Sequence, residues 1–378
     1  MSTVPAVAVF RHFAPLADPR LERTKLHRLI DIVVIALCAG LCGCDTWVEV
    51  AAFGRAKRKW FARFLELPNG IPSHDTFGRV FSLLDTGEFL ACLRSWLETL
   101  SLAVGGDVIA IDGKTLRGSV DRAVGKSALH LVSAWSTKNR VVLGQVATDA
   151  HSNEITAVPK LLRMLELLGA VVTLDAMGCQ KEIAAQIREQ GGDYVITLKA
   201  NQESLHESVC EAFDAYFRDE APGRVRVHET CETKHGRTET RIYHIMPAPA
   251  TLAGKAEWSG LRSIGMVARE RVIDGQETGD VRFYISSLPP KVKAFARAVR
   301  AHWGIENGLH WSLDVTLAED KSRVRTGNAA ETTGLLRRLV LSILKQDTRI
   351  PGSLRVKRLT AGWDETVLLQ LLAGFAGN

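Results

Sequence analysis

Asp-Val-Ile-Ala-Ile-Asp, residues 107–112, is a short apolar run rich in β-branched residues, and it follows the glycine pair at 105–106. Such a run predicts a buried strand that ends in the carboxylate of Asp112. The run Val-Val-Thr-Leu-Asp at residues 171–175 repeats this pattern and ends in Asp175. We therefore expect two buried strands, each with an aspartate at its carboxyl end.

The segments around these two runs predict an α/β layer. The patterns indicate strands at 128–136, 141–148 and 194–199, and helices at 153–168 and 179–190. The order strand, strand, strand, helix, strand, helix, strand is typical of a meander that leads into parallel crossover units. Chemistry in such sheets gathers beyond the carboxyl ends of the strands, where Asp112 and Asp175 are expected.

Helices are expected in the N-terminal part of the chain, residues 1–104. They lie at 26–43, at 46–65, in a segment entered through 71–76 with Ser73 as its N-cap, and at 88–102. A basic cluster in this region fits a module that reads DNA, and the spacing also fits a plain helical bundle. The cluster consists of Arg55, Lys57, Arg58 and Lys59.

The rest of the chain divides into a β-rich part and two helical parts. Residues 201–290 predict a short helix at 202–217 and strands at 224–232, 238–245, 261–272 and 281–287. Residues 291–320 contain a helix. Residues 321–378 predict a basic helical region with an amphipathic helix at 328–345 that carries Arg337 and Arg338.

A third acid lies in the helix expected around residues 299–320. At helical spacing, Glu306 lies one turn from both His302 and His310. The same face carries apolar residues at Phe295, Val299, Leu309, Leu313 and Leu317. Burying an unpaired carboxylate costs several kcal/mol, so we expect a cation or a donor beside Glu306. Gly304 and Gly308, on the opposite face, suggest a close backbone approach there.

Composition and charge are those of a globular protein of two or three domains. The chain has 378 residues, 46% of them hydrophobic, and a net charge of +6. Residues 321–378 contain ten Lys or Arg and four Asp or Glu, an excess equal to the whole net charge. A basic region suits a polyanionic partner and is also common on solvated surfaces.

Cysteine usage and hydropathy indicate a cytoplasmic protein. The seven cysteines show neither a paired framework nor zinc-finger spacing, which predicts small buried thiols in a reducing compartment. The longest apolar run, residues 32–44, is too short to span a bilayer, and the N-terminus lacks the pattern of a signal peptide. We therefore expect no membrane partner.

Asp112, Asp175 and Glu306 together offer carboxylate oxygen atoms and no soft ligand. Oxygen ligands suit Mg²⁺ or Mn²⁺ rather than zinc. Two such ions can activate an attacking oxygen and stabilise a departing one, as phosphodiester cleavage and strand transfer require. Each acid alone also has an ordinary interpretation, because Asp is common in turns and Glu306 could pair with a neighbouring histidine. Three acids on one edge favour the metal site.

Other chemistries fit the sequence less well. Residues 112–115, Asp-Gly-Lys-Thr, resemble the end of a P-loop, but Val108 stands where that motif needs Gly. A helix-borne zinc site of His302, Glu306 and His310 lacks the spacing of metalloproteases and leaves both aspartates unused. The sequence contains neither a nucleophile elbow nor a dinucleotide-binding glycine loop after a strand.

Four motifs resemble the H-repeat-associated branch of the bacterial DDE transposases, and the resemblance runs from about residue 10 to about residue 346. They are Ile-Asp-Gly-Lys-Thr-Leu-Arg-Gly at 111–118, Thr-Leu-Asp-Ala-Met-Gly-Cys-Gln-Lys-Glu-Ile at 173–183, Asp-Tyr-Val-Ile-Thr-Leu-Lys-Ala-Asn-Gln at 193–202 and His-Trp-Gly-Ile-Glu-Asn-Gly-Leu-His-Trp-Ser-Leu-Asp-Val at 302–315. Motifs of this length in this order are highly specific.

The resemblance implies a fold and a function. The fold is a ribonuclease-H-like mixed-sheet core at 105–200 and 291–320, a β-rich insertion at 201–290 and an N-terminal helical domain that binds DNA ends. The function is transposition of an insertion sequence in the nucleoid, by cutting DNA at the element ends and joining them to a target. Asp112, Asp175 and Glu306 would be the catalytic, metal-binding triad with two Mg²⁺ or Mn²⁺ ions. A homodimer would assemble with double-stranded DNA in a synaptic complex.

The sequence departs from the wider superfamily in its last helix. That helix usually carries Tyr, Arg, Glu and Lys where this chain has Val299, His302, Glu306 and Leu313. Candidates for the missing DNA contacts are His302, His310, Arg300 and Lys321. Together with the basic residues near the strand edge, the predicted DNA-binding set is Lys114, Arg117, Lys199, His302, His310, Arg323 and Arg325.

Two alternatives stay open at this point. One is a related metal-dependent nuclease that acts on another nucleic acid, and for it element-end DNA would have no advantage over random duplex. The other is a DNA-binding remnant that has lost catalysis, which would be inactive even in Mn²⁺.

Overall fold

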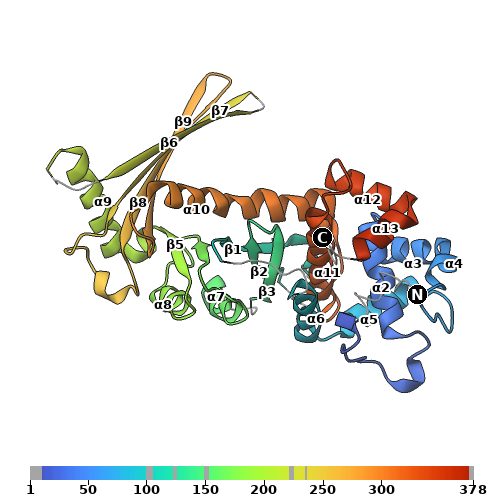
Figure 1. Cartoon of the computed structure of the whole chain (residues 1–378). Coiled ribbons are helices and arrows are strands. Elements are labelled where there is room, and N and C mark those ends of the chain that lie inside the picture. The colour runs from blue at the N-terminus through green and yellow to red at the C-terminus, as the bar shows by residue number, and fades with distance from the viewer. Residues whose placement is uncertain are drawn as a thin grey trace.

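The structure is a computed structural model that describes residues 11–98, 105–121, 125, 127–148, 153–220, 225–234 and 236–373. The expected ends of the helix at 88–102 and of the strand at 224–232 fall partly outside these residues, at 99–102 and 224. Within the described residues, a nine-stranded mixed sheet forms the centre. Long β-hairpins extend from one end of the sheet, and helices from both ends of the chain pack at the other (Figure 1). The expected mixed α/β class is confirmed.

The strand order across the sheet is β3-β2-β1-β4-β5-β9-β8-β7-β6. β4 pairs in parallel with both β1 and β5, and the other neighbours are antiparallel. The predicted meander and parallel crossover units are therefore confirmed. The strands are β1 (Val108–Leu116), β2 (Leu129–Ser136), β3 (Val141–Ala147), β4 (Val171–Leu174), β5 (Asp193–Leu198), β6 (Arg226–Lys234), β7 (Arg237–Pro247), β8 (Ser263–Ile273) and β9 (Gln276–Ser286).

β1 is longer than the sequence predicted. The expected strand ended at Asp112, but β1 continues to Leu116 because residues 113–116 pair with β2 in antiparallel register. The parallel pairing of β1 with β4 stops at Ala110, opposite Thr173. Asp112 therefore lies within a strand, yet just past the end of the parallel ladder.

The β-rich insertion is continuous with the central sheet. β9 pairs with β5, and β8, β7 and β6 follow outward in antiparallel order. β6 and β7 form one antiparallel hairpin, and β8 and β9 form another. The strands of residues 201–290 thus extend the same sheet and do not form a separate one.

Two layers of helices cover the faces of the sheet. One layer packs its apolar side chains on one face and consists of α7 (Glu154–Leu162), α8 (Lys181–Glu189) and α9 (Glu203–Phe217). On the other face, Phe295 and Val299 of α10 (Val292–Ile305) pack against the strands (Figure 1). Gly265 in β8 permits this approach, because a Cβ there would lie 2.3 Å from the Phe295 ring.

Helices from the two ends of the chain share one hydrophobic core, which also includes Trp135 and Val142 of the sheet. The predicted N-cap is confirmed, since Ser73 Oγ accepts the backbone N–H of Thr76. Thr46 and Glu49 form a capping box at the start of α3. The helices are α2 (Leu29–Leu41), α3 (Trp47–Ala56), α4 (Arg58–Phe61), α5 (His74–Leu83), α6 (Thr86–Glu98), α11 (Ala329–Gln346), α12 (Leu354–Trp363) and α13 (Glu365–Leu372).

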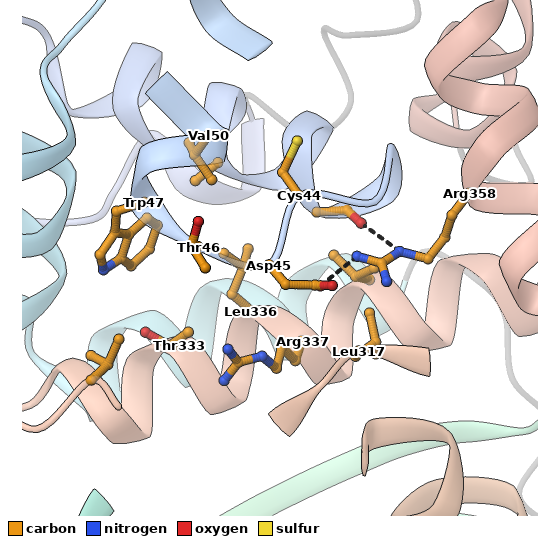
Figure 2. Close-up of a pocket in the computed structure, with 14 residues that line it drawn as sticks. Cys44, Asp45, Thr46, Trp47, Val50, Leu317, Thr333, Leu336, Arg337 and Arg358 are labelled. Carbon is orange, nitrogen blue, oxygen red and sulfur yellow. Dashed lines mark hydrogen bonds and ion pairs between the residues drawn. The ribbon is translucent and has the colours of Figure 1, made fainter. Parts of the chain in front are cut away.

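The positive charge of the C-terminal region lies only partly on the surface. α11 was expected to be an amphipathic helix that carries Arg337 and Arg338, but it is packed on nearly all sides and both arginines are buried. Arg358 of α12 is buried too. It donates to Asp45 Oδ1 at 2.6 Å and to the Gly40 carbonyl at 3.1 Å, beside a small cavity between α3 and α11 (Figure 2).

The cysteines form no disulfide, since all seven lie within the described residues and are free. Cys38, Cys92 and Cys179 are buried as predicted, whereas Cys231 is exposed. Among the helices that the structure describes, none combines the length and the apolar character that crossing a membrane requires.

Candidate active site

Asp112 and Asp175 lie at the same edge of the sheet, as predicted. Asp175 is the first residue after β4, the parallel neighbour of β1, and both aspartates line one cavity of about 220 Å³. Asp175 Oδ1 also accepts the backbone N–H groups of Met177 at 2.9 Å and Gly178 at 3.3 Å. Asp175 thus has the turn role that is ordinary for an aspartate, and it also lines the cavity.

Glu306 begins a π-helical segment directly after α10. Residues Glu306–His310 and Ser312–Thr316 form π-helical turns, which occur often at functional sites. The apolar residues predicted for one face are all buried. The Glu306 side chain is 54% exposed, so its expected burial in that stripe is wrong. Glu306 instead lines the cavity that it shares with Asp112 and Asp175.

The two glycines of this helix differ in their surroundings. A Cβ on Gly308 would lie 3.3 Å from the Trp135 ring, so the expected close approach exists there, although to a side chain. A Cβ on Gly304 would meet no atom within 4 Å. The close approach expected at Gly304 is therefore wrong.

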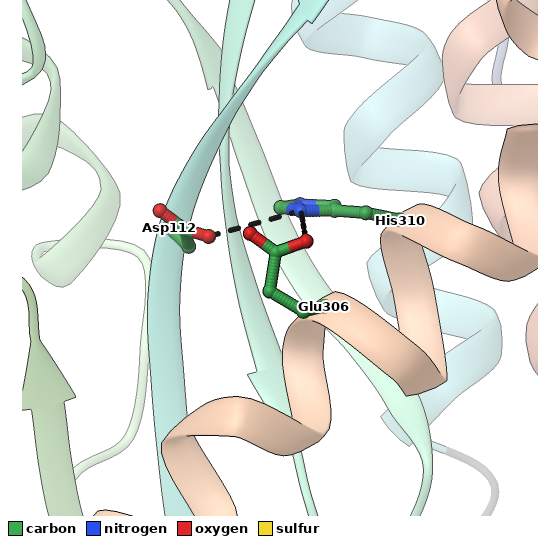
Figure 3. A group of neighbouring side chains, drawn as sticks. All are labelled: Asp112, Glu306 and His310. Atoms are coloured by element: carbon green, nitrogen blue, oxygen red, sulfur yellow. Dashed lines mark ion pairs between the residues drawn. The ribbon is translucent and has the colours of Figure 1, made fainter. Parts of the chain in front are cut away.

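His310 brings Asp112 and Glu306 together (Figure 3). Its Nδ1 lies 3.7 Å from Asp112 Oδ2 and 3.5 Å from Glu306 Oε2. One ligand atom from each of the three residues lies within 4.8 Å of the other two. Glu306 thus pairs with His310, as the ordinary interpretation of this acid allowed. His310 is buried, and its Nε2 has no hydrogen-bond partner within the described part of the chain.

The carboxylates of the site are influenced by burial and by one another. Burial raises the pKa of Asp112 to about 6, the His310 ring opposes the rise, and the charges of Glu306 and Glu154 add to it. A hydrogen bond with His310 holds the pKa of Glu306 below its usual range. Burial, and then the charge of Glu154, raise the pKa of Asp175. A cation would relieve this crowding of negative groups.

These residues fit a divalent cation. Two carboxylates and one imidazole nitrogen converge, a buried ring nitrogen of His310 lacks a partner, and Asp175 lines the same cavity. The set differs from the oxygen-only set that the sequence predicted, because the structure groups His310 with Asp112 and Glu306. Carboxylates suit Mg²⁺ and Mn²⁺, and imidazole is a ligand of several transition metals.

His302 is an uncharged member of the cavity wall. Its Nδ1 lies 3.0 Å from Thr173 Oγ1, and burial lowers the pKa of His302 to about 4. The ring is therefore neutral at pH 7. It can therefore exchange hydrogen bonds but carries no positive charge.

Lys114 lies in a buried cluster of ions and not on a DNA-facing surface. It is 8% exposed, and its Nζ lies 2.8 Å from Asp314 Oδ1, 3.0 Å from Asp320 Oδ1 and 3.5 Å from Glu319 Oε2. Glu319 also accepts a hydrogen bond from Arg338. The structure thus favours a structural role for Lys114 over the predicted phosphate contact, because its charge is already balanced.

The remaining basic candidates are exposed or line open surfaces. Lys199 follows β5, is exposed and lines the cavity of the three acids. Arg117, Arg323 and Arg325 line a second, open cavity of about 700 Å³ together with Lys321, and we call this surface the basic groove, although Asp121 and Asp320 also line it and Asp320 lies 3.7 Å from Arg117. The Arg117 side chain is 84% exposed, whereas Arg325 donates to the Gly118 carbonyl at 3.2 Å. The basic groove is therefore an available surface for phosphates.

Gly118 sets the shape of the basic groove, and Gly118→Ala is expected to destabilise the protein by about 1–3 kcal/mol through overpacking. A Cβ on Gly118 would lie 1.9 Å from the backbone oxygen of Ser322, so the chain around residues 320–322 would have to move. Urea unfolding measures the loss. Gly105→Ala is the matched control, because a Cβ there meets no atom within 4 Å, and equal stability of the two variants would contradict the prediction.

Glu154 and His130 lie beside β1 next to Asp112, and no sequence pattern predicted either of them. Glu154, the first residue of α7, accepts a hydrogen bond from His130 of β2 at 2.8 Å. His130 also contacts Thr115 of β1. The position of Glu154 after Asn153 indicated only a helix start, and its contacts come from strands that are distant in the sequence. The one available signal was Gly113 directly after Asp112, where the absence of a side chain makes room for this pair.

The chain is similar to known proteins over nearly its whole length. A family model described as "Transposase DDE domain" matches residues 104–343, and one described as "DDE_Tnp_1-associated" matches residues 10–97. "Putative transposase YncI" of Escherichia coli O157:H7 is 39% identical over 96% of this chain and 93% of its own length. "H repeat-associated putative transposase YhhI" of Escherichia coli (strain K12) is 37% identical over 97% of this chain and 98% of its own length. The chain therefore belongs to the DDE transposase family, in its H-repeat-associated branch.

Proposed function

We propose that the protein is the transposase of an insertion sequence, which binds the ends of its element, cuts phosphodiester bonds there and joins the ends to target DNA. The observation that carries the proposal is the convergence of Asp112, Asp175 and Glu306 on one cavity, although they are far apart in the chain. Membership of the DDE transposase family supports the same reaction class.

Asp112, Asp175 and Glu306 are assigned as the residues that hold two Mg²⁺ or Mn²⁺ ions. Such cations activate the attacking oxygen and stabilise the departing oxygen in phosphodiester cleavage. His310 orients Asp112 and Glu306 through its ring, and the neutral His302 shapes the cavity wall beside them. Lys199 is placed to contact a phosphate of the bound strand.

The fold supports a separate role for each part of the chain. The order β3-β2-β1-β4-β5, with its parallel β1–β4–β5 part, supports a ribonuclease-H-like core formed by residues 105–200 and 291–320. Residues 1–104 are proposed to bind the element ends, since Arg55, Arg58 and Lys59 are exposed there. Lys57 pairs with Glu365 at 3.1 Å instead. We further propose a homodimer in the synaptic complex, acting in the nucleoid.

A cleavage assay tests the proposal. Purified protein with Mg²⁺ is expected to nick and join duplex DNA that carries the inverted repeats flanking the gene, and to leave random duplex of the same length largely intact. Equal cleavage of both duplexes would replace the proposal with a nuclease of broader substrate class. No cleavage in either Mg²⁺ or Mn²⁺ would indicate a DNA-binding remnant.

The basic groove gives a separate prediction about DNA affinity. Changing both Arg117 and Arg323 to Gln is expected to weaken duplex binding most at low salt, because each lost phosphate contact reduces the slope of log K against log salt by about 0.9. Fluorescence anisotropy over a salt series measures the slope. Lys234→Gln, at the tip of the β6–β7 hairpin, is the control. An unchanged slope in the double variant would remove the basic groove from the DNA-binding surface.

A further inference from the structure

Arg282 of β9 lines the same cavity as the three assigned acids. The ladder between β5 and β9 ends where Leu198 pairs with Phe283, so Arg282 lies just past the carboxyl end of β5, where Lys199 follows. Among the described residues that line the cavity, Arg282 and Lys199 are the two that carry a positive charge at neutral pH. The β-rich insertion thus contributes a cation to the edge of the sheet where the acids lie.

The guanidinium of Arg282 is held on two sides. Its Nε donates to Asp280 Oδ2 at 2.9 Å, and its Cζ lies 4.8 Å from the centroid of the Trp303 ring. Both contacts suit a planar guanidinium. Its two Nη groups make no hydrogen bond with any other residue that the structure describes. They are therefore free to donate to a ligand that accepts two parallel N–H bonds, as a phosphate does.

Arg269 shares the partners of Arg282 but not its place in the cavity. Arg269 Nε donates to Asp280 Oδ1 at 2.6 Å, and its Cζ lies 5.7 Å from the centroid of the Trp303 ring. One carboxylate, that of Asp280, is thus divided between two arginines. Arg269 also approaches Glu239 at 3.8 Å, and it lines a smaller cavity beside Arg282 instead of the cavity of the acids.

We propose that Arg282 binds a phosphodiester group of the DNA strand that enters the cavity of the acids, with its Nη groups as the donors. This inference rests on the proposed function. A strand in the cavity brings negative phosphates towards three carboxylates, and a fixed cation at the wall offsets that repulsion. His302 cannot do so because its ring is neutral. A guanidinium that is already held in place also loses little conformational freedom when the strand binds.

Arg282→Gln and Arg269→Gln form a matched pair that tests the inference in the full-length protein. Each variant removes one of the two arginines that share Asp280 and Trp303, but only Arg282 lines the cavity of the acids. On duplex with the inverted repeat, Arg282→Gln is expected to lower kcat/KM for Mg²⁺-dependent cleavage on the order of 10- to 100-fold. Fluorescence anisotropy over a salt series should show a slope of log K against log salt reduced by about 0.9. Arg269→Gln should keep wild-type values.

Two further measurements distinguish a phosphate contact from a structural role. Arg282→Lys should recover part of the loss in kcat/KM, because it keeps the charge but not the planar fork of donors. Mn²⁺ binding, counted by electron paramagnetic resonance of free and bound ion without DNA, should be the same in the wild type and in all three variants. The substituted side chains are not assigned as metal ligands.

The outcomes separate this inference from the proposed function. If Arg282→Gln matches the wild type in rate and salt slope, Arg282 contacts no phosphate and the proposed function stands. Equal losses in Arg282→Gln and Arg269→Gln would show a structural role for the pair and would also overturn the inference. A wild type that binds the duplex without cutting it contradicts the proposed function, while the salt slope still decides on Arg282. If the wild type binds no DNA, both fail. Should Arg282→Gln not fold, a wild-type kcat/KM in Arg282→Lys would overturn the inference.

Discussion

Replacement of Asp112 by Asn is expected to reduce Mg²⁺-dependent nicking and joining of element-end DNA on the order of a thousandfold, because a loss of several kcal/mol of transition-state stabilisation has that effect on rate. Asp112 lies in the group with Glu306 and His310 and also lines the cavity that Asp175 lines. Its Oδ2 faces His310, and its charge interacts with those of Glu306 and Glu154. The amide has nearly the same shape, but it is a much poorer ligand for a divalent cation.

The folded state should tolerate this change. Burial raises the pKa of Asp112 above its ordinary value, so in the absence of metal its charge opposes folding at neutral pH. Asn removes that charge, and its side-chain oxygen can still accept the Gly113 N–H, which Asp112 Oδ1 accepts at 2.9 Å. The thermal midpoint of metal-free Asp112→Asn is therefore expected to equal or exceed that of the wild type.

Cleavage kinetics and thermal unfolding of the same preparation check both parts. Asp274→Asn is the control, because Asp274 lies in the β8–β9 turn with a positive φ of 50°, which Asn also accepts. It should keep full activity. An Asp112→Asn variant that still nicks and joins DNA at the wild-type rate would show that the metal-binding triad is wrongly assigned.

The shared edge of Asp112 and Asp175 was predictable from the sequence because it depends on local information. Each aspartate follows a short apolar run, and a crossover helix between such runs makes the strands parallel neighbours. The strand order then puts both carboxyl ends on one edge. Glu306 could be added because its relation to His310 is a helical spacing, which survives the change to π-helical turns.

Features that depend on distant partners were not predictable. Residues 113–116 extend β1 only because β2 pairs with them, and nothing in their own composition requires it. The contact between Glu154 and His130 lies in the space left by Gly113, so three elements had to be placed before it could be predicted. Sequence patterns record which residues share an element, and they do not record which elements approach one another.

Charged residues were the most misleading signal. Lys114 was predicted to contact DNA, and Arg337 and Arg338 were predicted in an amphipathic helix of a basic region, where a charge usually indicates a surface. All three are buried, since carboxylates lie in the same interior: Lys114 and Arg338 both contact Glu319. A buried cation and its partner are two residues far apart in the chain, and no spacing rule links them.

This interior ion cluster leads to the second large prediction, that Arg338→Met destabilises the protein by about 3–5 kcal/mol. Arg338 is fully buried. Its Nη1 donates to Glu319 Oε1 at 2.8 Å and to the Gly334 carbonyl at 3.0 Å. Met fills much of the same volume, but it leaves the buried Glu319 carboxylate with less positive charge around it. The cost comes from that uncompensated charge.

Urea unfolding of Arg338→Met measures the loss, and Arg300→Met is the matched control. Arg300 donates to Glu232 at 2.7 Å, but the two side chains are 42% and 39% exposed, so this pair is expected to contribute less than about 1 kcal/mol. Adding Glu319→Gln to Arg338→Met should recover part of the stability, because the stranded charge is then removed. Equal losses for Arg338→Met and Arg300→Met would show that the interior pair contributes no more than a surface pair.

The same cluster links stability to the active site. Lys114 contacts Glu319, as Arg338 does, and lies two residues after Asp112 in β1. Lys114 also pairs with Asp314, which lies in the second π-helical segment, Ser312–Thr316. Removing Arg338 is therefore expected to loosen both segments that carry the assigned acids. If so, Arg338→Met should lower Mn²⁺ affinity at temperatures where the protein is still folded, whereas Arg300→Met should leave it unchanged.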